Sequence, residues 1–159
     1  MITTSEMRDV LNSKSLFAEF SDEELEQFIA LLDPEEFAAG THIVRQDEVG
    51  DCMYILVHGR ATVLHHKDGR EIQLAVLQPG DFFGELALVD RGLRSADVLA
   101  DEDCVLLKIT QPAVSALSGV YPSAAFKLLI AIGRLMVERL RKSNQRYVDS
   151  LLFPLAEAP

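Results

Sequence analysis

Cysteine is scarce in this sequence. Only Cys52 and Cys104 are present, each within an apolar run, and their spacing does not resemble a disulfide framework or a C-x-x-C metal site. We therefore expect buried, reduced thiols in a cytoplasmic protein. The N-terminus has no basic segment leading into an apolar core, and the longest apolar stretch, residues 128–137, is interrupted by Arg134. This stretch is too short to span a membrane, so we expect no membrane contact.

Positive charge is also in short supply. The 15 lysines and arginines are outnumbered by 25 aspartates and glutamates, which gives a net charge of −10. A negative chain repels nucleic acid and anionic membranes at long range. The basic residues between 127 and 146 are typical of a solvated helix face. We expect no direct nucleic-acid binding, and any nucleotide would have to be held by a local cluster of groups.

The length suits a single domain, 1–159, which would bury roughly 70% of its unfolded surface without disulfides or metal. We divide it into a helical lead-in at 1–34, a β-rich region at 35–110, a hinge with C-terminal helices at 111–151 and a short tail at 152–159.

Helix signals come first in the lead-in. Residues 1–14 indicate no more than a loose or short helix. Ser21 at an N-cap position, with Glu24 three residues on, predicts a capping box and the start of a second helix. The apolar residues that follow at helical spacing give this helix one face for the core: Leu25, Phe28, Ile29 and Leu32.

The pattern changes after Phe37 to short β-rich runs separated by glycines and turns. Six runs are expected to be strands: 41–45, 52–57, 61–66, 71–77, 95–100 and 104–109. Runs of about six residues at this spacing favour an antiparallel sandwich or barrel over a parallel sheet. Asp68 and Gly69 lie between two of the runs, and an Asp-Gly pair is typical of a tight type I′ hairpin turn.

Helical signals return after 110. Residues 111–119 begin with Pro112 in the first turn and end at Gly119, which suits a helix C-terminus. A long helix from 123 to about 151 would measure roughly 40 Å. Its apolar residues lie near one side and suit packing on the β-rich region or on the same helix of a second subunit: Leu129, Ile132, Met136, Leu140 and Tyr147.

The segment 81–96, DFFGELALVDRGLRSA, combines groups that bind a phosphate and a sugar. A helix start after Gly84 would point the N–H groups of residues 84–87 outward as a cradle for a small anion, and glycine lets a ligand approach the backbone. Arg94 offers a planar fork for two phosphate oxygens. The carboxylate of Glu85 beside an anion makes sense as an acceptor for hydroxyl groups. A ligand that offers both a phosphate and a sugar hydroxyl is a nucleotide, so the segment predicts a nucleotide site.

This segment resembles the phosphate-binding cassette of the cyclic nucleotide-binding domain, a family that includes bacterial CRP/FNR-type regulators, regulatory subunits of cAMP-dependent kinase and cyclic nucleotide-gated channels. The matching residues are Phe83, Gly84, Glu85, Leu86 and Ala87, followed by Arg94, Ser95 and Ala96. The resemblance implies that Glu85 holds the ribose 2′-hydroxyl, that Arg94 holds the cyclic phosphate and that Ser95 adds a hydroxyl or N–H donor. Leu93 stands where many members have proline.

The resemblance extends through the β-rich region, where residues 53–56 followed by Gly59 match a second stretch of the family. It implies a mainly β fold: an eight-stranded antiparallel β-roll (a jelly-roll-like double-stranded β-helix) with an N-terminal helix and a long C-terminal helix. Asp47 stands where the family usually has glycine. Because aspartate tolerates left-handed backbone better than most residues, we expect a strained turn there and no loss of fold.

Two polar residues, Ser143 and Asn144, interrupt the apolar side of the long helix. The corresponding positions of CRP-type proteins carry the groups that touch the adenine amine, so the resemblance implies that both contact the base. The alternative, which stays open, is that they face water or set the register of a dimer.

These observations predict a cyclic nucleotide sensor, with cAMP favoured over cGMP, that signals through its C-terminal helix to a protein partner which the sequence does not identify. We expect no catalytic residue, metal or cofactor, and the long helix suits a homodimer. CRP/FNR-type transcription factors continue past this helix into a helix-turn-helix, whereas this sequence stops, so we do not expect it to read DNA.

Two other functions stay open. In a ligand-free interaction module that only dimerises or docks, Arg94 would pair with a nearby acid: Asp90, Asp97 or Glu85. A cupin-like metalloenzyme would use histidines, of which there are four: His42, His58, His65 and His66. Adjacent residues of a strand point to opposite faces, so His65 and His66 could not both reach one ion, and no acidic residue follows at cupin spacing.

Overall fold

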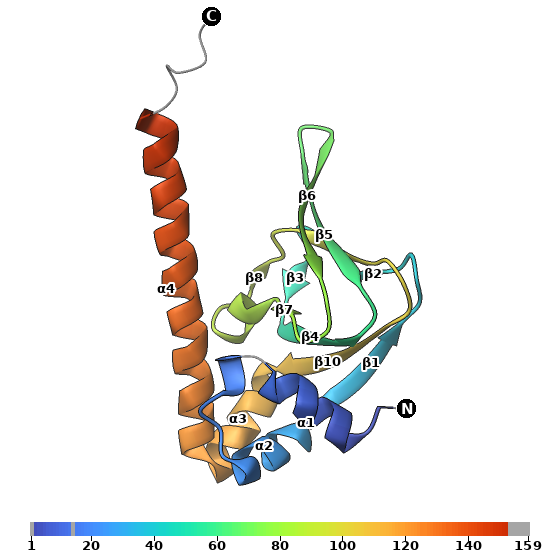
Figure 1. Cartoon of the computed structure of the whole chain (residues 1–159), viewed down its shortest axis with the longest axis vertical. Coiled ribbons are helices and arrows are strands. Elements are labelled where there is room, and N and C mark those ends of the chain that lie inside the picture. The colour runs from blue at the N-terminus through green and yellow to red at the C-terminus, as the bar shows by residue number, and fades with distance from the viewer. Residues whose placement is uncertain (1, 14, 153–159) are drawn as a thin grey trace, which may run out of the picture.

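The computed structural model describes residues 2–13 and 15–152, so the predicted tail beyond 152 lies outside the described residues. The chain begins with α1 (Thr4–Asn12), the 3-10 helix η1 (Ser15–Phe17) and α2 (Asp22–Ile29), which gather at one end of the molecule (Figure 1). The short helix allowed for in residues 1–14 is α1, where Thr3 and Glu6 form a reciprocal capping box.

The start of α2 follows the prediction in part. The hydroxyl of Ser21 accepts a hydrogen bond from the N–H of Glu24 at 3.2 Å. The carboxylate of Glu24 accepts hydrogen bonds at 2.8 and 3.1 Å from Lys127 of the C-terminal helix. Glu24 thus ties two helices that are distant in the sequence.

The β-rich region folds as a roll of two four-stranded antiparallel sheets, which confirms the predicted eight-stranded architecture (Figure 1). One sheet has the order β1-β10-β4-β7 and the other β2-β9-β5-β6. Their strands are β1 (Asp33–Phe37), β2 (His42–Val44), β4 (Cys52–His58), β5 (Ala61–Lys67), β6 (Arg70–Leu77), β7 (Phe82–Phe83), β9 (Asp97–Ala100) and β10 (Cys104–Thr110). A two-stranded ribbon pairs β3 (Val49–Gly50) with β8 (Gly92–Leu93).

Strand β1 was not predicted, because Pro34 lies within it and glutamates follow. Proline cannot donate a hydrogen bond to a neighbouring strand, so it is confined to edge strands. Strand β1 is the edge of its sheet and pairs with β10, where Pro34 lies opposite Leu107. The run predicted at 95–100 becomes a strand only from Asp97.

Both predicted left-handed turns are confirmed. Asp68 and Gly69 have φ values of 53° and 73°, as a type I′ hairpin requires, and they join β5 to β6. Asp47 has a φ of 66°.

The core has two parts, and β4 belongs to both. Met53, Ile55 and Val57 face the helices, while Cys52, Tyr54 and Leu56 face the inside of the roll. A strand buried on both faces needs a continuous apolar run, which explains the sequence CMYILV. The core therefore fixes the β-roll and the helical end against each other.

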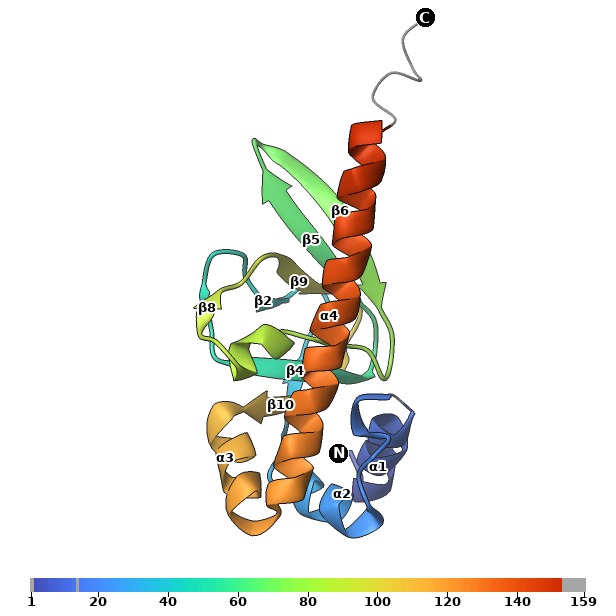
Figure 2. The same ribbon diagram turned by 90° about the vertical axis from the view of Figure 1, so that its left-hand side faces the viewer.

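Two helices follow the roll. Helix α3 (Gln111–Val120) has Pro112 in its first turn and ends one residue after Gly119, which does not adopt left-handed backbone. Helix α4 (Pro122–Leu152) is 31 residues long. Its first part packs on the helical end, and the rest runs up past the roll (Figures 1 and 2). Of the predicted apolar side, Ile132 is buried, whereas Leu140 and Tyr147 are exposed.

Within residues 2–13 and 15–152, none of the helices has the length and apolar character needed to span a membrane.

Candidate functional site

The predicted cassette connects β7 to β8. Gly84 has left-handed backbone, with a φ of 77°, and the 3-10 helix η2 (Glu85–Leu88) starts directly after it. Gln111, at the start of α3, donates hydrogen bonds from its Nε2 to the carbonyl oxygens of Ala87 (3.1 Å) and Leu88 (3.3 Å). These bonds fix the far end of η2. The N–H of Ala87 donates to the carbonyl oxygen of Gly84 at 3.1 Å, so it is used within the turn. The first N–H groups of a helical turn have no acceptor within it, and a cradle for an anion made by the N–H groups of residues 84–87 stays a prediction.

Arg94 lies in a slot between two glycines. A Cβ added to Gly50 would come within 2.7 Å of the Arg94 Nε atom, and one added to Gly84 would overlap its Nη1. The Nη2 atom donates a hydrogen bond to the carbonyl oxygen of Cys52 at 2.7 Å. The guanidinium is therefore held in a fixed place, and any larger residue at either glycine would displace it.

Glu85 is 2% exposed, and its carboxylate accepts a hydrogen bond from Arg139 of α4. The Arg139 side chain is about half exposed, at 54%. This ion pair joins the cassette to the C-terminal helix. Among the described residues, Arg94 forms no ion pair with a carboxylate, so the pairing required by the ligand-free alternative is not formed.

A cavity of about 590 Å³, here called the cassette cavity, brings the predicted residues together. Its lining includes seven of the eight predicted cassette residues: Phe83, Gly84, Glu85, Leu86, Ala87, Arg94 and Ser95. The eighth, Ala96, is buried in the roll. Strands β5 and β6 contribute an apolar wall, and α4 contributes Met136 and Arg139. The volume lies within the roughly 300–1,000 Å³ typical of small-molecule sites.

An aromatic pair supports the cassette on the inner side. Phe83 stacks on Tyr54 with ring centroids 5.5 Å apart, and Tyr54 donates a hydrogen bond to Glu35 at 3.2 Å. Burial and the neighbouring Cys52 and Glu35 raise the pKa of the Tyr54 hydroxyl, so it remains a neutral donor. Burial likewise raises the pKa of the Cys52 thiol.

Ser143 and Asn144 are exposed on α4 and do not line the cassette cavity. Ser143 lies seven residues after Met136 and four after Arg139, so helical geometry places it on the same side of α4 as those two cavity residues, one turn beyond. Asn144 is rotated further round the helix. Their contact with a base stays a prediction.

Two of the histidines, His65 and His66, form polar contacts within the roll, whereas His58 pairs with Glu6 of α1 at 3.5 Å. The Nδ1 atom of His65 lies 2.8 Å from the carbonyl oxygen of Ser95, and the Nε2 atom of His66 lies 2.8 Å from the Asp97 carboxylate. His65 and His66 thus use different partners. In the part of the chain that the structure describes, no group of three histidines, cysteines or acids is arranged to hold a metal ion.

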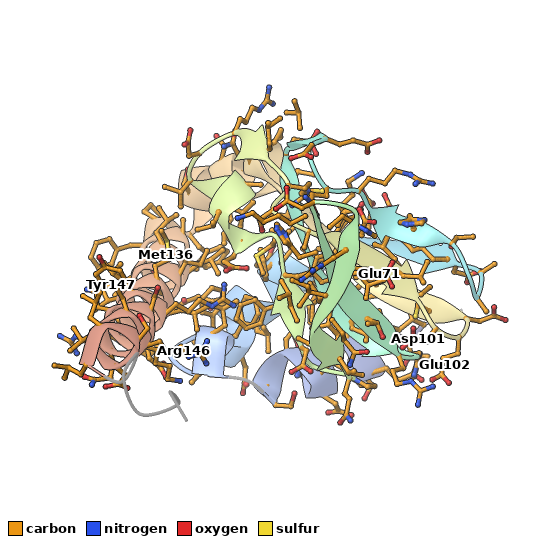
Figure 3. The ribbon with its side chains drawn as sticks, turned by 90° about the horizontal axis from the view of Figure 1, so that it is seen from above. Glu71, Asp101, Glu102, Met136, Arg146 and Tyr147 are labelled. Atoms are coloured by element: carbon orange, nitrogen blue, oxygen red, sulfur yellow. The ribbon has the colours of Figure 1, made fainter. Side chains whose placement is uncertain are left out.

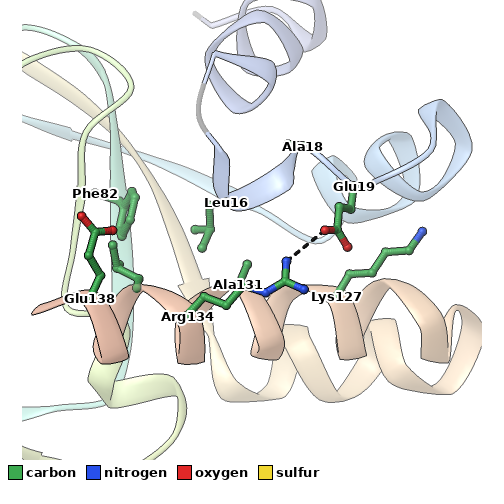
Figure 4. Close-up of a pocket in the computed structure, with 9 residues that line it drawn as sticks. Leu16, Ala18, Glu19, Phe82, Lys127, Ala131, Arg134 and Glu138 are labelled. Carbon is green, nitrogen blue, oxygen red and sulfur yellow. Dashed lines mark hydrogen bonds and ion pairs between the residues drawn. The ribbon is translucent and has the colours of Figure 1, made fainter. Parts of the chain in front are cut away.

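A second cavity, of about 340 Å³, lies between the η1 segment and α4 (Figure 4). The ion pair between Glu19 and Arg134, at 3.0 Å, crosses it. Phe82 lines this cavity as well as the cassette cavity. One residue of β7 therefore belongs to the lining of both cavities.

Sequence reasoning missed three residues at the site: Gly50, Gln111 and Arg139. The backbone of Gly50 has no positive φ, so its conformation does not require glycine. The need for glycine arises from the guanidinium of Arg94, which lies where a side chain would be. Gln111 was assigned only to a helix start. Arg139 stood among other basic residues of α4, and a single arginine toward the roll cannot be distinguished from a solvated face by spacing alone.

The chain was compared with known families. Residues 34–119, more than half of the chain, match the family model described as the cyclic nucleotide-binding domain. The Cyclic AMP receptor protein of Thermus thermophilus is 30% identical over 135 residues, which cover 84% of this chain and 61% of that protein. cGMP-dependent protein kinase 2 of Mus musculus is 33% identical over 102 residues, which cover 63% of this chain and 13% of that protein.

Solved structures show the same relationship. The N-terminal domain of a transcriptional regulator from Streptomyces coelicolor aligns with a TM-score of 0.76 at 33% identity, covering 86% of this chain and 96% of that one. The chain thus matches one whole solved domain, while it spans 61% and 13% of the two longer relatives.

Proposed function

The chain belongs to the cyclic nucleotide-binding domain family, and we propose that it is a regulatory module that binds cAMP in the cassette cavity and signals through α4. The proposal covers the nucleotide, the residues that hold it and the route by which binding is transmitted. It assigns no catalytic role to the chain.

One observation carries the proposal: Arg94 and Glu85 line the same cavity. Arg94 would bind two oxygens of the cyclic phosphate, since a guanidinium fork matches that geometry. The N–H groups after Gly84 would add donors to the same anion. Glu85 has a second carboxylate oxygen to accept a hydrogen bond from the ribose 2′-hydroxyl while Arg139 binds the first.

The choice of cAMP rests on the comparison with relatives. The Thermus thermophilus relative, which covers 84% of this chain, is named for cyclic AMP, whereas the kinase named for cGMP covers 63%. Ser95 does not decide between the two nucleotides. Titration of both separates them directly.

Signalling requires that the ligand bind more tightly to one arrangement of α4 than to another, because a ligand shifts an equilibrium only by its differential affinity. Arg139 and Met136 bring α4 to the cavity. A nucleotide bound to the second oxygen of Glu85 adds a partner to the carboxylate that Arg139 of α4 binds. Ser143, one turn further on, would then be within range of the base.

We also propose that α4 pairs in parallel with α4 of a second copy. Side chains at a seven-residue spacing form an exposed stripe, with Ile130, Val137, Asn144 and Leu151 at one position of the repeat and Gly133, Leu140 and Tyr147 at the other. Branched residues at the first position and one asparagine among them favour a parallel two-stranded coiled coil in fixed register. Tyr147 lies on the side of α4 away from the roll (Figure 3).

Isothermal titration calorimetry with cAMP and cGMP tests the binding site. Replacing Arg94 with alanine removes a charged hydrogen bond worth about 1.5–3 kcal/mol, so Arg94→Ala should bind cAMP at least about 10- to 100-fold more weakly than the parent. Equal affinities would show that the pocket assignment is wrong. Thermal unfolding confirms that the variant is folded.

One observation favours the ligand-free module: Glu85 already has a partner in Arg139, and Arg94 already bonds the Cys52 carbonyl. Thermal-shift measurements with cAMP, cGMP and cyclic dinucleotides distinguish the two functions, because a ligand that binds only the folded state raises Tm. No shift with any of them at millimolar concentration would favour the module.

A further inference from the structure

A buried carboxylate, Asp97, lies behind the cassette and is not part of the cavity lining. Its Oδ1 accepts a hydrogen bond from the backbone N–H of Gln46 at 2.6 Å. Its Oδ2 lies 2.8 Å from the Nε2 atom of His66 and 3.5 Å from that of His42. One side chain on β9 therefore binds β2, the turn after β2, and β5.

The turn that Asp97 holds also carries the backbone of Arg94. The N–H of Asp47 donates to the carbonyl oxygen of Arg94 at 2.9 Å, and the N–H of Arg94 donates to the carbonyl oxygen of Glu48 at 2.7 Å. Gln46, Asp47 and Glu48 are consecutive, and Asp47 has left-handed backbone. An anchor on Gln46 thus fixes the two peptide groups against which Arg94 rests.

The same turn is fastened to β5 through Gln46. The Gln46 Nε2 donates to the carbonyl oxygen of His66 at 2.9 Å, and the N–H of His66 donates to the Gln46 Oε1 at 2.8 Å. On the other side of Arg94, the Nδ1 atom of His65 lies 2.8 Å from the carbonyl oxygen of Ser95. Arg94 is therefore held between two fixed points of β5.

Charge favours this arrangement. Burial raises the pKa of the Asp97 carboxyl, but the hydrogen bonds from Gln46 and His66 and the nearby imidazole of His42 outweigh burial and place the pKa below its ordinary value. Glu71, on β6, is the other charged group near His66, at 3.8 Å. Asp97 is thus a carboxylate at neutral pH and a stronger acceptor than an amide.

We propose that Asp97 is a positioning residue for Arg94: through the turn 46–48 it fixes where the guanidinium stands, and so sets the affinity for the ligand phosphate without touching it. This inference rests on the proposed function. The slot between Gly50 and Gly84 leaves little freedom, and a guanidinium fork must be well placed to bind two oxygens at once.

Asp97→Asn tests the proposal, because the variant keeps the shape and loses the charge. The expected result is cAMP binding about 5- to 20-fold weaker than the parent, less than the loss in Arg94→Ala. Asp101→Asn is the matched control. Asp101 also accepts a hydrogen bond from β5, from Thr62 Oγ1 at 2.8 Å, but it lies on the far side of the roll from α4 (Figure 3). The Asp101→Asn variant should bind cAMP with the affinity of the parent.

A ligand-independent measurement separates positioning from general destabilisation. Amide hydrogen exchange, followed by ¹H–¹⁵N spectra, should show faster exchange in Asp97→Asn at Gln46, Asp47 and Arg94, with Leu99 and Ala100 of β9 nearly unchanged. Faster exchange spread evenly along β9 would overturn the positioning role. So would unchanged cAMP affinity in Asp97→Asn while Arg94→Ala loses binding. If the parent binds no cyclic nucleotide, the proposed function fails, and the exchange pattern still decides whether Asp97 positions Arg94.

Discussion

Arg139 of α4 binds the buried carboxylate of Glu85, so the cassette and the C-terminal helix are joined by one ion pair. Glu85 is nearly inaccessible to water, whereas Arg139 is about half exposed. A buried carboxylate needs a donor, and in this arrangement α4 provides it. The carboxylate of Glu85 therefore keeps this hydrogen bond only while α4 stays in its present position.

Removing that donor should destabilise the fold. Arg139→Ala leaves a buried acceptor without this partner, and we expect a loss of about 1–3 kcal/mol in the free energy of unfolding, measured by urea denaturation. Arg141→Ala, two residues along on an exposed part of α4, should change little. If the ribose hydroxyl binds Glu85, saturating cAMP should stabilise Arg139→Ala more than the parent. An equal gain in both would argue against that contact.

The glycine slot gives a second prediction. Gly50→Ala should weaken cAMP binding about tenfold or more, because a Cβ there would collide with the guanidinium of Arg94, while backbone strain is absent. Gly92 is the Cα partner of Gly50 in the β3–β8 ribbon, and a Cβ on Gly92 would meet no atom within 4 Å. Gly92→Ala is therefore the matched control for the ribbon. Because Gly92 also lines the cassette cavity, calorimetry should find a much smaller loss of affinity than in Gly50→Ala. Similar losses in both variants would mean that the ribbon, and not the slot, is responsible.

Acid should weaken the contribution of Asp97. Its folded-state pKa lies below the ordinary value of 3.8, so its ionised form stabilises the fold above that value and the gain is lost as pH falls through the folded pKa. The difference in unfolding free energy between parent and Asp97→Asn should shrink as pH is lowered from about 5 to below the ordinary carboxyl pKa. Denaturant unfolding at several pH values measures this. A difference that stays constant through that range would contradict the assignment.

The stripe on α4 predicts a dimer that depends on its apolar residues. Leu140→Glu places a charge in the seam and should give a monomer by analytical ultracentrifugation. Asp149→Lys changes charge outside the seven-residue stripe and should leave the assembly intact. A parent chain that remains monomeric at high concentration would exclude the pairing.

Asp47 offers a test of backbone strain. A non-glycine residue at a φ of 66° is strained, so Asp47→Gly should be neutral or stabilising by up to about 1 kcal/mol, whereas Asp47→Val should destabilise by about 1–2 kcal/mol. Thermal unfolding compares the two. Greater stability in the valine variant would show that this turn has a different conformation in solution.

Much of the fold could be predicted from local patterns. The β4 run CMYILV, the Asp-Gly turn at 68–69 and the Ser21 cap each act through nearest neighbours, and the structure has all three. The two-residue strands β3, β7 and β8 carry no periodicity, since two residues cannot show one. Strand β1 is stabilised by its partner β10 despite Pro34, which only the tertiary fold reveals.

The part of the site that could be predicted consists of residues whose chemical groups and spacing within one short segment both indicate ligand binding. Glu85 and Arg94 lie nine residues apart in the sequence, and both line the cassette cavity. Gly50 and Arg139 come from distant segments, and their role depends on which atom approaches them in space. No property of a lone glycine or of one arginine in a basic helix encodes that approach. Asp97 was considered only as a partner for Arg94, whereas it binds Gln46 and His66.

Phe82 lines both the cavity beside Arg134 and the cassette cavity. Because Phe82 and residues of α4 line both cavities, we expect that a molecule bound in one changes the shape of the other. A compound bound beside Arg134 should therefore alter the affinity of the cassette cavity for its ligand without entering it.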